Sequence, residues 1–193
     1  MIRHEAPPES WDCTIRLSQI PRSGEIFRER FELPLGGEIE HWGQIYTSIG
    51  PVQAEIAANY SSERILAKVS VRANFTLPCS RCLTDTGVAI IGDLRYLFTL
   101  RPERKETDDD EDSGEHGQED GDVDVIPVDS FQAEIDFTPY IWEVLILNLP
   151  ERIICRDDCE GLCPVCGTNR NERDCGCREE NVDPRFEVLR DLG

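Results

Sequence analysis

The sequence has few basic side chains, few histidines and no long apolar run. Its 20 lysines and arginines stand against 39 aspartates and glutamates, so the formal net charge is -19. Binding to a phosphate backbone needs lysine and arginine, so this balance argues against non-specific nucleic-acid binding by the whole surface and leaves only local RNA contacts. The three histidines are scattered and form no interpretable arrangement with serine and aspartate. We therefore predict that the protein is not an enzyme.

Two further absences concern the compartment. No run of residues approaches the roughly 18 apolar positions of a membrane span, and the first residues, MIRHEAPPES, contain no apolar core of a signal peptide. We therefore expect a cytoplasmic protein with no membrane partner. Thiols stay reduced in that compartment, so clustered cysteines are expected to bind metal or to act in redox chemistry.

Much of the negative charge lies in one segment. Residues 103–124, ERKETDDDEDSGEHGQEDGDVD, hold twelve acidic and two basic side chains. Because this segment has dense like charge and almost nothing to bury, it is expected to be a flexible acidic loop. A cation-binding loop is the alternative, but the spacing of the carboxylates does not match that of an EF-hand.

Alternation of apolar and polar residues predicts β-strands before and after this loop. Every second residue is apolar over residues 65–77, which predicts a long, half-buried strand. Residues 52–60 are compatible with its hairpin partner, and residues 88–100 with a further strand. Residues 12–33 predict a strand, a turn and a second extended piece, and residues 130–137 another strand.

One buried helix and one terminal helix are expected. Thr138 is a suitable cap and Pro139 a suitable first residue for a short helix whose apolar positions lie in residues 140–147. Residues 183–192 have apolar side chains at a spacing of three, which predicts a helix near the end of the chain. The predicted fold class is α+β: an antiparallel β-sheet or partial barrel with few short helices, followed by a cysteine-rich zinc-binding module.

The chain is expected to divide into four parts. The expected parts are a first section of the β domain (1–102), the acidic loop (103–124), a strand and helix that complete the β domain (125–150), and a C-terminal zinc-binding module with its helix (151–193).

Eight of the nine cysteines fall into four pairs: Cys79/Cys82, Cys155/Cys159, Cys163/Cys166 and Cys175/Cys177. Thiolate prefers zinc among the available cytosolic cations, and structural zinc sites have four protein ligands in a tetrahedron. Four pairs therefore predict two structural zinc ions. Catalytic zinc is disfavoured, because such sites usually keep an open position. Cys13 stands alone and is expected to be a small apolar residue.

Two partitions of these pairs are open. A short loop closes at low cost, which favours one site from Cys163, Cys166, Cys175 and Cys177, and a second from Cys79, Cys82, Cys155 and Cys159. The alternative joins Cys155–Cys166 on one metal and Cys79/Cys82 with Cys175/Cys177 on the other. An iron–sulfur cluster is the main rival to zinc, because four cysteines also suit it.

Several pieces of the sequence occur in the same order in a known family. They are Cys79-Ser80-Arg81-Cys82-Leu83, the acidic segment, Ile135-Asp136-Phe137, Trp142-Glu143, Leu149-Pro150, the run from Cys159 to Asn169, Cys175-Gly176-Cys177 and Asp183-Pro184-Arg185-Phe186. Over residues 40–192 the chain resembles the YceD-like family, the large ribosomal RNA subunit accumulation proteins. The resemblance implies a non-enzymatic role in the synthesis or maturation of large-subunit (23S) ribosomal RNA in bacteria. It also implies a ribosomal RNA precursor or a pre-ribosomal large-subunit particle as partner.

Arginines near the cysteines are candidates for contact with RNA or a protein partner. They are Arg81, Arg156, Arg170 and Arg173, with Arg152 and Arg178 nearby. Acidic residues are interleaved with them, so local ion pairs are the alternative. Two other functions stay open: an interaction module that binds a basic ribosomal protein, and a thiol redox protein. The redox function has less support, because Cys79 and Cys82 follow a strand and a reactive thiol benefits from a helix N-terminus.

Overall fold

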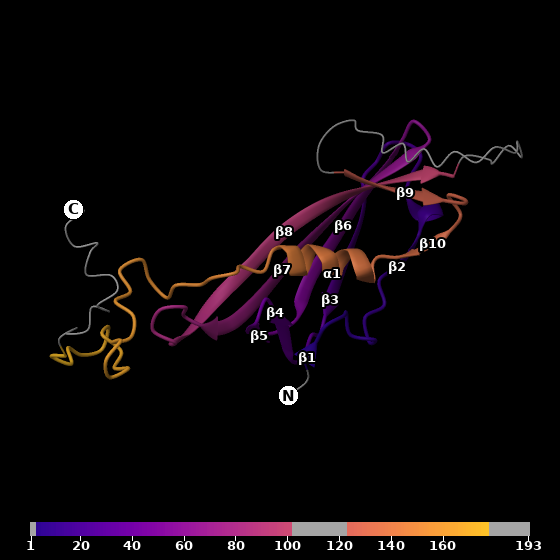
Figure 1. The fold of residues 1–193 in the computed structure, drawn as a ribbon. Helices are drawn as coiled ribbons and strands as arrows, with labels where there is room; N and C mark the ends of the chain where they lie inside the picture. Colours follow the sequence, from indigo (N-terminus) through magenta and orange to yellow (C-terminus); the bar gives the residue numbers. More distant parts are fainter. Residues whose placement is uncertain (1–2, 102–122, 178–193) are drawn as a thin grey trace, which may run out of the picture. The chain divides into compact units, whose positions relative to one another are not determined.

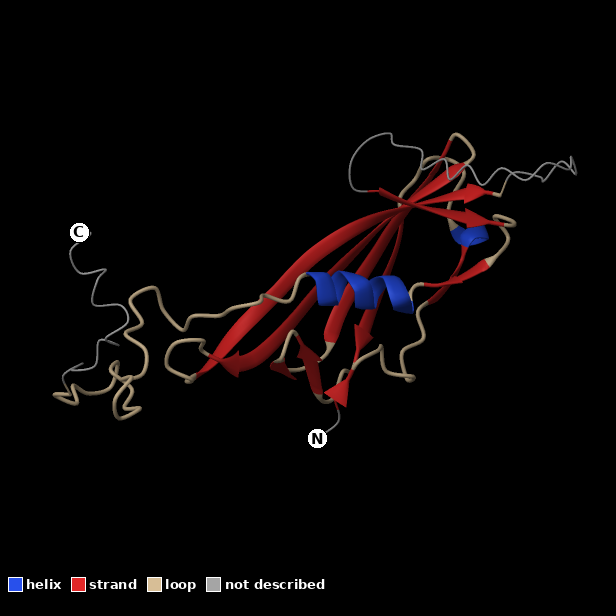
Figure 2. Ribbon diagram, viewed as in Figure 1, coloured by secondary structure: helices blue, strands red, loops and turns tan. Residues whose placement is uncertain are grey.

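The computed structural model describes residues 3–101 and 123–177, and most of its regular structure is β-strand (Figures 1 and 2). The elements are β1 (Arg3–His4), β2 (Thr14–Arg16), η1 (a 3-10 helix, Leu17–Gln19), β3 (Phe27–Leu33), β4 (Glu38–His41), β5 (Gln44–Ser48), β6 (Val52–Ser61), β7 (Arg64–Pro78), β8 (Asp85–Leu100), β9 (Val123–Val128), β10 (Glu134–Asp136) and α1 (Thr138–Leu147). A mainly antiparallel sheet with one α-helix confirms the predicted combination of strand and helix.

The hairpin of β6 and β7 forms the centre of the main sheet. Ser61 pairs with Arg64, and the two residues between them, Ser62 and Glu63, have φ angles of 50° and 58°. Positive φ at both positions is the geometry of a tight turn whose twist matches that of the strands. The even-numbered residues of β6 and the odd-numbered residues of β7 face the core, and most of them are fully buried. The strand predicted at residues 65–77 and its hairpin partner are confirmed.

The main sheet has the strand order β1-β4-β5-β7-β6-β3, and β8 pairs with β7 and β9 with β8. Two edge pairs, β1 with β4 and β8 with β9, are parallel. A parallel neighbour needs a long connection, which residues 102–122 supply between β8 and β9. Strand β9 begins at Val123, so the prediction of a loop through residue 124 was wrong at its end. Pro127 lies in this edge strand, where a missing N–H is tolerated.

Strands β4 and β5 were missed in the sequence. They form a hairpin in which His41 pairs with Gln44, and the turn between them consists of Trp42 and Gly43, with φ angles of 49° and 72°. Each of these short strands has only one fully buried side chain, Ile39 in β4 and Tyr46 in β5, so the sequence gives no clear period-two signal.

Helix α1 lies across one face of the main sheet (Figure 2). Its buried residues Ile141, Val144 and Leu145 pack into a core that also holds aromatic rings of β8. The Phe98 ring centroid is 5.7 Å from that of Phe137, and the Tyr96 centroid is 4.6 Å from that of Tyr140. This packing explains why a helix of ten residues is stable here.

The start of the helix differs from the prediction. Phe137 occupies the cap position and Thr138 is already helical. The backbone N–H of Thr138 donates to Oδ1 of Asp136 at 2.8 Å, so a carboxylate just before the helix does the work expected of the Thr138 side chain. The strand predicted at residues 130–137 is restricted to β10, which pairs with β2 in a separate two-stranded sheet.

The chain divides into two compact units. The β unit comprises Met1–Phe75 and Val88–Leu149, and the cysteine unit comprises Thr76–Gly87 and Pro150–Gly193. The cysteine unit therefore contains the loop that joins β7 to β8. Among the described residues, no helix has the length and apolar character needed to cross a membrane. The acidic segment up to residue 122, the terminal helix predicted at residues 183–192, and Arg178 lie outside the described residues.

Candidate metal centre

Eight cysteines of the cysteine unit form two groups of four. We call Cys79, Cys82, Cys155 and Cys159 the hairpin-tip site, and Cys163, Cys166, Cys175 and Cys177 the C-terminal site. In each group all four sulfurs lie within 4.8 Å of one another, so each could hold a metal ion. This grouping is the partition that short loop closure favoured. The alternative, with Cys79/Cys82 joined to Cys175/Cys177, was wrong.

The sulfur separations in the hairpin-tip site fit a single tetrahedral metal. A zinc–sulfur bond of about 2.3 Å places the sulfurs of a tetrahedron about 3.8 Å apart. Sγ of Cys79 lies 3.9 Å from that of Cys159, and Sγ of Cys82 lies 3.6 Å from that of Cys155. In a 4Fe–4S cluster each cysteine binds a different iron, and in a 2Fe–2S cluster two cysteines bind each iron, so cysteine sulfurs on different irons would lie farther apart. The geometry therefore favours one metal ion for each site.

Two cysteine loops of the unit have the same backbone hydrogen bonds. One spans residues 79–84 and the other residues 163–168, and we call them knuckles. In the first, the N–H of Cys79 donates to the carbonyl of Thr84 at 2.9 Å; in the second, Cys163 donates to Thr168 at 2.8 Å. The second cysteine of each knuckle has its sulfur 3.3 Å and 3.2 Å from the hydroxyl oxygen of the respective threonine. Both loops thus present two sulfurs to one point.

The two knuckles differ at one backbone position. The residue after the second cysteine has positive φ in both: 59° at Leu83 and 72° at Gly167. The left-handed region is accessible to glycine at no steric cost, whereas leucine is strained there. Each of these residues donates its N–H to the carbonyl of the first cysteine, at 3.0 Å from Leu83 and 2.8 Å from Gly167. The closed turn needs this conformation, which explains why Leu83 adopts it.

Backbone hydrogen bonds join residues 153–162 to the first knuckle. Ser80 donates its N–H to the carbonyl of Ile153 at 2.8 Å, and Leu162 donates to the carbonyl of Arg81 at 3.0 Å. Gly161 has φ of 73°, and a Cβ at this position would lie 3.1 Å from the carbonyl oxygen of Arg81. A side chain at this position would require a small shift of the Arg81 carbonyl and would be strained at this positive φ.

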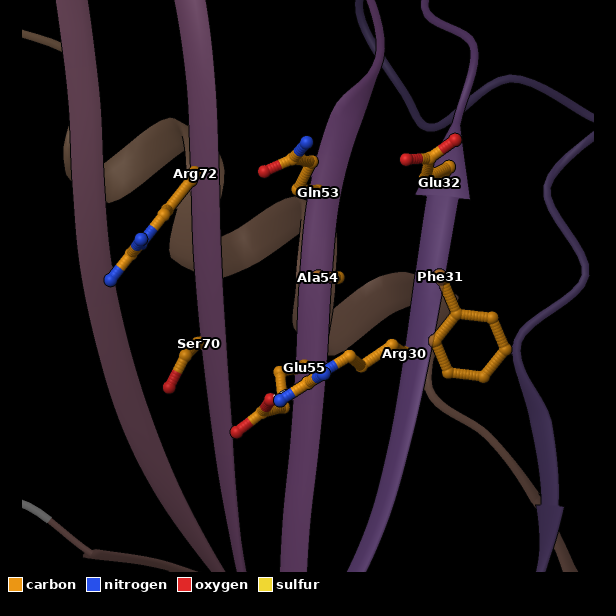
Figure 3. A pocket seen from close by; sticks show the side chains of 8 residues that line it. All are labelled: Arg30, Phe31, Glu32, Gln53, Ala54, Glu55, Ser70 and Arg72. Carbon is orange, nitrogen blue, oxygen red and sulfur yellow. Dashed lines mark hydrogen bonds and ion pairs between the residues drawn. The ribbon is translucent and has the colours of Figure 1, made fainter.

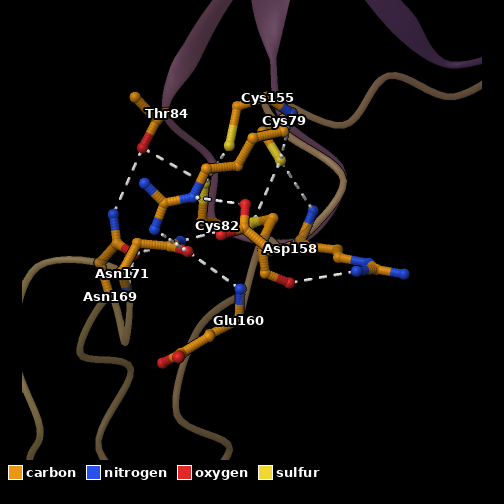
Figure 4. A network of polar contacts seen from close by, with 11 residues as sticks. Cys79, Cys82, Thr84, Cys155, Asp158, Glu160, Asn169 and Asn171 are labelled. Atoms are coloured by element: carbon orange, nitrogen blue, oxygen red, sulfur yellow. Dashed lines mark hydrogen bonds and ion pairs between the residues drawn. The ribbon is translucent and has the colours of Figure 1, made fainter.

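Asn171 lies at the centre of a polar network around the hairpin-tip site (Figure 4). Its amide nitrogen donates to Sγ of Cys159 at 3.4 Å, and its amide oxygen accepts the N–H of Glu160 at 2.9 Å. Asn169 donates to the hydroxyl of Thr84 at 3.3 Å, so Thr84 is left to donate to a thiolate at Cys82. Hydrogen bonds to ligand sulfur orient metal sites and stabilise their charge.

Thr84, Thr168, Asn169 and Asn171 were missed as site residues in the sequence. One signal was available, because each C-x-x-C is followed by threonine two positions later. The role of Asn171 had no such signal, since it depends on a contact twelve residues back along the chain.

Backbone N–H groups lower the pKa of the first cysteine of each knuckle. Burial raises the pKa of Cys79, but backbone N–H groups of Cys82, Arg81 and Cys155 outweigh it and hold the pKa at about 6. The N–H groups of Cys166 and Val165 likewise lower the pKa of Cys163 to about 6. The knuckles are therefore prepared to present thiolate near neutral pH, as a metal ligand must be.

Two thiols outside the knuckles, those of Cys155 and Cys177, have a raised pKa. Burial, with the neighbouring sulfur of Cys82, raises the pKa of Cys155 to about 12. Hydrogen bonds with Cys166 and Cys175 raise the pKa of Cys177 to about 12. A cation among the four sulfurs would reverse this, because its charge stabilises each thiolate. With four thiolates each, neither site offers an open position for water, so the arrangement suits a structural metal.

Two of the arginines near the cysteines, Arg81 and Arg156, are engaged within the unit. Arg81 donates from Nη1 to the carbonyl of Cys159 at 3.1 Å. Arg156 donates to the amide oxygen of Asn171 at 2.8 Å, and its Nε lies 3.2 Å from a carboxylate oxygen of Asp158. Residues 76–87 and 150–177 carry five arginines and seven carboxylates, before the thiolates are counted. Contact of Arg81, Arg156, Arg170 and Arg173 with RNA or a partner stays a prediction.

Comparison with known proteins shows to which family the chain belongs. The family model described as large ribosomal RNA subunit accumulation protein YceD matches residues 67–193. Over 155 residues the chain is 28% identical to the large ribosomal RNA subunit accumulation protein YCED homolog 1, chloroplastic, of Arabidopsis thaliana, which covers 74% of this chain and 48% of that protein. Over 178 residues it is 28% identical to the uncharacterized protein YlbN of Bacillus subtilis, with 92% of both chains covered.

A third relative, the uncharacterized protein Rv2926c of Mycobacterium tuberculosis, is 30% identical over 129 residues, which cover 66% of this chain and 55% of that protein. The chain thus spans about half the length of the Arabidopsis and mycobacterial relatives. No solved structure matches it. Because the family model covers the β7–β8 loop and all eight clustered cysteines, the chain belongs to the YceD family, the large ribosomal RNA subunit accumulation proteins.

Proposed function

We propose that this chain is a non-enzymatic factor in the accumulation of large-subunit (23S) ribosomal RNA, and that two structural zinc ions stabilise its cysteine unit. The family membership carries the ribosomal part of the proposal. The sulfur separations of 3.6 Å and 3.9 Å at the hairpin-tip site support a tetrahedral metal. Cytosolic availability and the preference of thiolate make zinc the metal of choice.

The metal ions would act by holding distant parts of the chain together. The hairpin-tip site joins residues 79–82 to residues 155–159, and the C-terminal site closes the segment that follows. Because the described residues 151–177 contain little regular structure, the two metals would supply much of the folding free energy of the cysteine unit. The proposed partner is a ribosomal RNA precursor or a pre-ribosomal large-subunit particle in the cytoplasm.

A basic ribosomal protein is a second proposed partner. The chain has a net charge of -19, and two tetrathiolate zinc sites would each add two negative charges. Such a surface complements a lysine-rich ribosomal protein and would steer its association.

Metal content and ribosome profiles test the proposal together. The purified protein is expected to hold about two zinc ions per chain by elemental analysis. Cys159→Ser and Cys175→Ser should each reduce this to one, whereas Cys13→Ala, which removes a thiol outside both sites, should keep two. A brown protein containing iron would contradict zinc.

The ribosomal role is tested in bacterial cells that lack the protein. Sucrose-gradient profiles should show a deficit of large subunits relative to small subunits, and the wild-type chain should restore them. Cys159→Ser should restore them poorly, while Cys13→Ala should restore them fully. A normal large-subunit profile in the deletion strain would refute the ribosomal role.

A further inference from the structure

The face of the main sheet opposite helix α1 carries most of the basic side chains of β3, β6 and β7. In Figure 3 the helix passes behind these strands, and the labelled polar side chains lie on the other side. We call this surface the open face. On these three strands its charged residues are Arg28, Arg30, Glu32, Glu55, Arg64, Lys68 and Arg72, five basic and two acidic. A local excess of positive charge stands out in a chain of net charge -19.

The strand register explains how these side chains come together. Arg30 is paired across β3 and β6 with Glu55, which is paired across β6 and β7 with Ser70. Gln53 is paired with Arg72 in the same way. Residues that pair across strands point to the same face, so the donors form rows two residues apart. Along β7 the row reads Lys68, Ser70, Arg72 and Asn74, each of them a hydrogen-bond donor.

Two of the guanidinium groups contact one carboxylate, that of Glu55. Nε of Arg30 lies 2.6 Å from Glu55, and Nε of Arg28 lies 3.9 Å from it. The hydrogen bond from Arg30, together with the charges of Arg28 and Arg72, lowers the pKa of Glu55. The Arg30 and Arg28 side chains are 78% and 54% exposed. Lys68 is likewise paired, with its Nζ 3.2 Å from a carboxylate oxygen of Asp93 on β8. Ion pairs between exposed side chains contribute little stability, so an incoming anion can displace Glu55 and Asp93 at little cost.

The open face is also hollowed. A hollow of about 520 Å³ is lined by Arg30, Gln53, Ser70 and Arg72 among others. A second hollow of about 230 Å³ shares Gln53 and Arg72 with the first and adds Asn74 and two exposed isoleucines, Ile49 and Ile91. Positive charge, amide groups and apolar surface therefore adjoin one another at Arg72.

We propose that the open face binds a single-stranded segment of RNA, with phosphates at Arg30, Lys68 and Arg72 and a base against Ile49 and Ile91. The inference rests on the proposed function, because RNA is the polyanion that a ribosomal RNA factor meets. Strand geometry places Lys68 and Arg72, four residues apart on β7, about 13 Å from each other, which is comparable to two steps between phosphates of an extended strand. Guanidinium pairs with phosphate by charge-assisted hydrogen bonds. Single-stranded RNA also exposes its base edges to the amides of Gln53 and Asn74.

The test is binding of the zinc-loaded full chain to a fluorescein-labelled 20-nucleotide single-stranded RNA of mixed sequence, followed by anisotropy. Arg30→Gln combined with Arg72→Gln should weaken binding about tenfold and reduce the slope of log affinity against log salt by about 1.4, since each phosphate contact to a single strand contributes about 0.7. The matched control is Arg16→Gln with Arg22→Gln, which makes the same change of charge outside the main sheet. The control should bind as the wild type does.

Three outcomes would overturn the inference. The first is that the wild-type chain does not bind the RNA. The second is that RNA binding is weakened as much in the control as in the open-face variant. The third is that poly-glutamate displaces the RNA as readily as unlabelled RNA does. The last would make the open face a site for acidic proteins. Circular dichroism of both variants keeps misfolding apart from lost contacts. The proposed function is judged separately, by whether the wild-type chain restores large subunits in the deletion strain.

Discussion

Sγ of Cys79 lies 3.9 Å from Sγ of Cys159, although eighty positions separate the two residues. The C-terminal site, by contrast, is complete within residues 163–177. Closing the longer loop costs about 1.5 kcal/mol more in chain entropy than closing the shorter one. The hairpin-tip site therefore depends on the fold of β7 and β8, whereas the C-terminal site can form locally.

The two sites should differ in how fast they lose zinc. Three sulfurs of the hairpin-tip site belong to residues that are at most 5% exposed, whereas Cys166 of the C-terminal site is exposed. Oxidants and chelators attack accessible thiolates first. Zinc release in hydrogen peroxide, followed with a colorimetric chelator, should show two phases of equal amplitude, and the fast phase should come from the C-terminal site.

A variant shows which site releases its zinc in each phase. Cys166→Ser removes a ligand of the C-terminal site alone, so the purified variant should release its remaining zinc in the slow phase. If the remaining zinc leaves in the fast phase, the order of lability is the reverse of the one expected.

Opposite substitutions at the positive-φ residues of the two knuckles, Leu83→Gly and Gly167→Ala, should have opposite effects on zinc affinity. Leu83 is 63% exposed, so Leu83→Gly removes strain with little loss of packing, and it should stabilise the first knuckle by about 0.5 kcal/mol. A Cβ at Gly167 would meet nothing within 4 Å, so Gly167→Ala has only a conformational cost, about 1 kcal/mol. Zinc competition with a chelator measures both. Equal affinities for Gly167→Ala and the wild type would exclude a left-handed requirement at that position.

Patterns that extend over many residues could be recognised in the sequence. The strand at residues 65–77 has seven apolar residues in strict alternation, and β7 has the burial that this alternation requires. The choice between two partitions of the cysteines followed from loop length alone, because the shortest closure has the lowest entropic cost. Both patterns can be recognised from positions in the sequence alone, without knowledge of the tertiary structure.

Other features depend on contacts that the sequence does not display. Asn171 contributes to the hairpin-tip site only because the chain returns to Cys159, and Leu83 adopts positive φ only because the knuckle closes around it. Strand β9 contains Pro127 and pairs in parallel, and both features hide it from a search for alternating hairpin strands. The open face was overlooked because its arginines are dispersed over β3 and β7 and meet only in the folded sheet.

Asn171 should tune the metal affinity of the hairpin-tip site. Asn171→Asp keeps an oxygen that can accept from the N–H of Glu160 and from Arg156, but it loses the donor to Cys159 and adds a negative charge beside the thiolates. It should weaken zinc binding about tenfold or more at this site, as loss of an outer-shell partner typically does. Asn171→Ala loses both kinds of contact and should weaken binding similarly.

The readout is zinc affinity in Cys175→Ser, a background in which the hairpin-tip site alone is complete. Asn59→Ala in β6, an asparagine of the β unit, is the control and should leave the affinity unchanged. An affinity that Asn171→Asp leaves unaltered would mean that the bond to Cys159 makes no contribution.

Cys13 should make the stability of the β unit fall at high pH. Its side chain is fully buried, and burial, aided by the carboxylates of Asp136 and Asp12, raises its pKa from 9.0 to about 11. A folded-state pKa above the unfolded value means that the neutral thiol contributes stability that is complete below pH 9. This contribution is lost as the pH rises from 9 through 11, and its size is on the order of 1–2 kcal/mol.

Urea unfolding of the wild type and of Cys13→Ala between pH 8 and pH 11 isolates this contribution, because both proteins share every other titrating thiol and tyrosine. The free energy of unfolding of the wild type should fall more steeply above pH 9 than that of the variant. Alkylation by iodoacetamide gives a second measurement, since a fully buried thiol should react only after unfolding. Parallel pH profiles for the two proteins, or rapid alkylation of Cys13 in the folded state, would show that this thiol is not held neutral in the core.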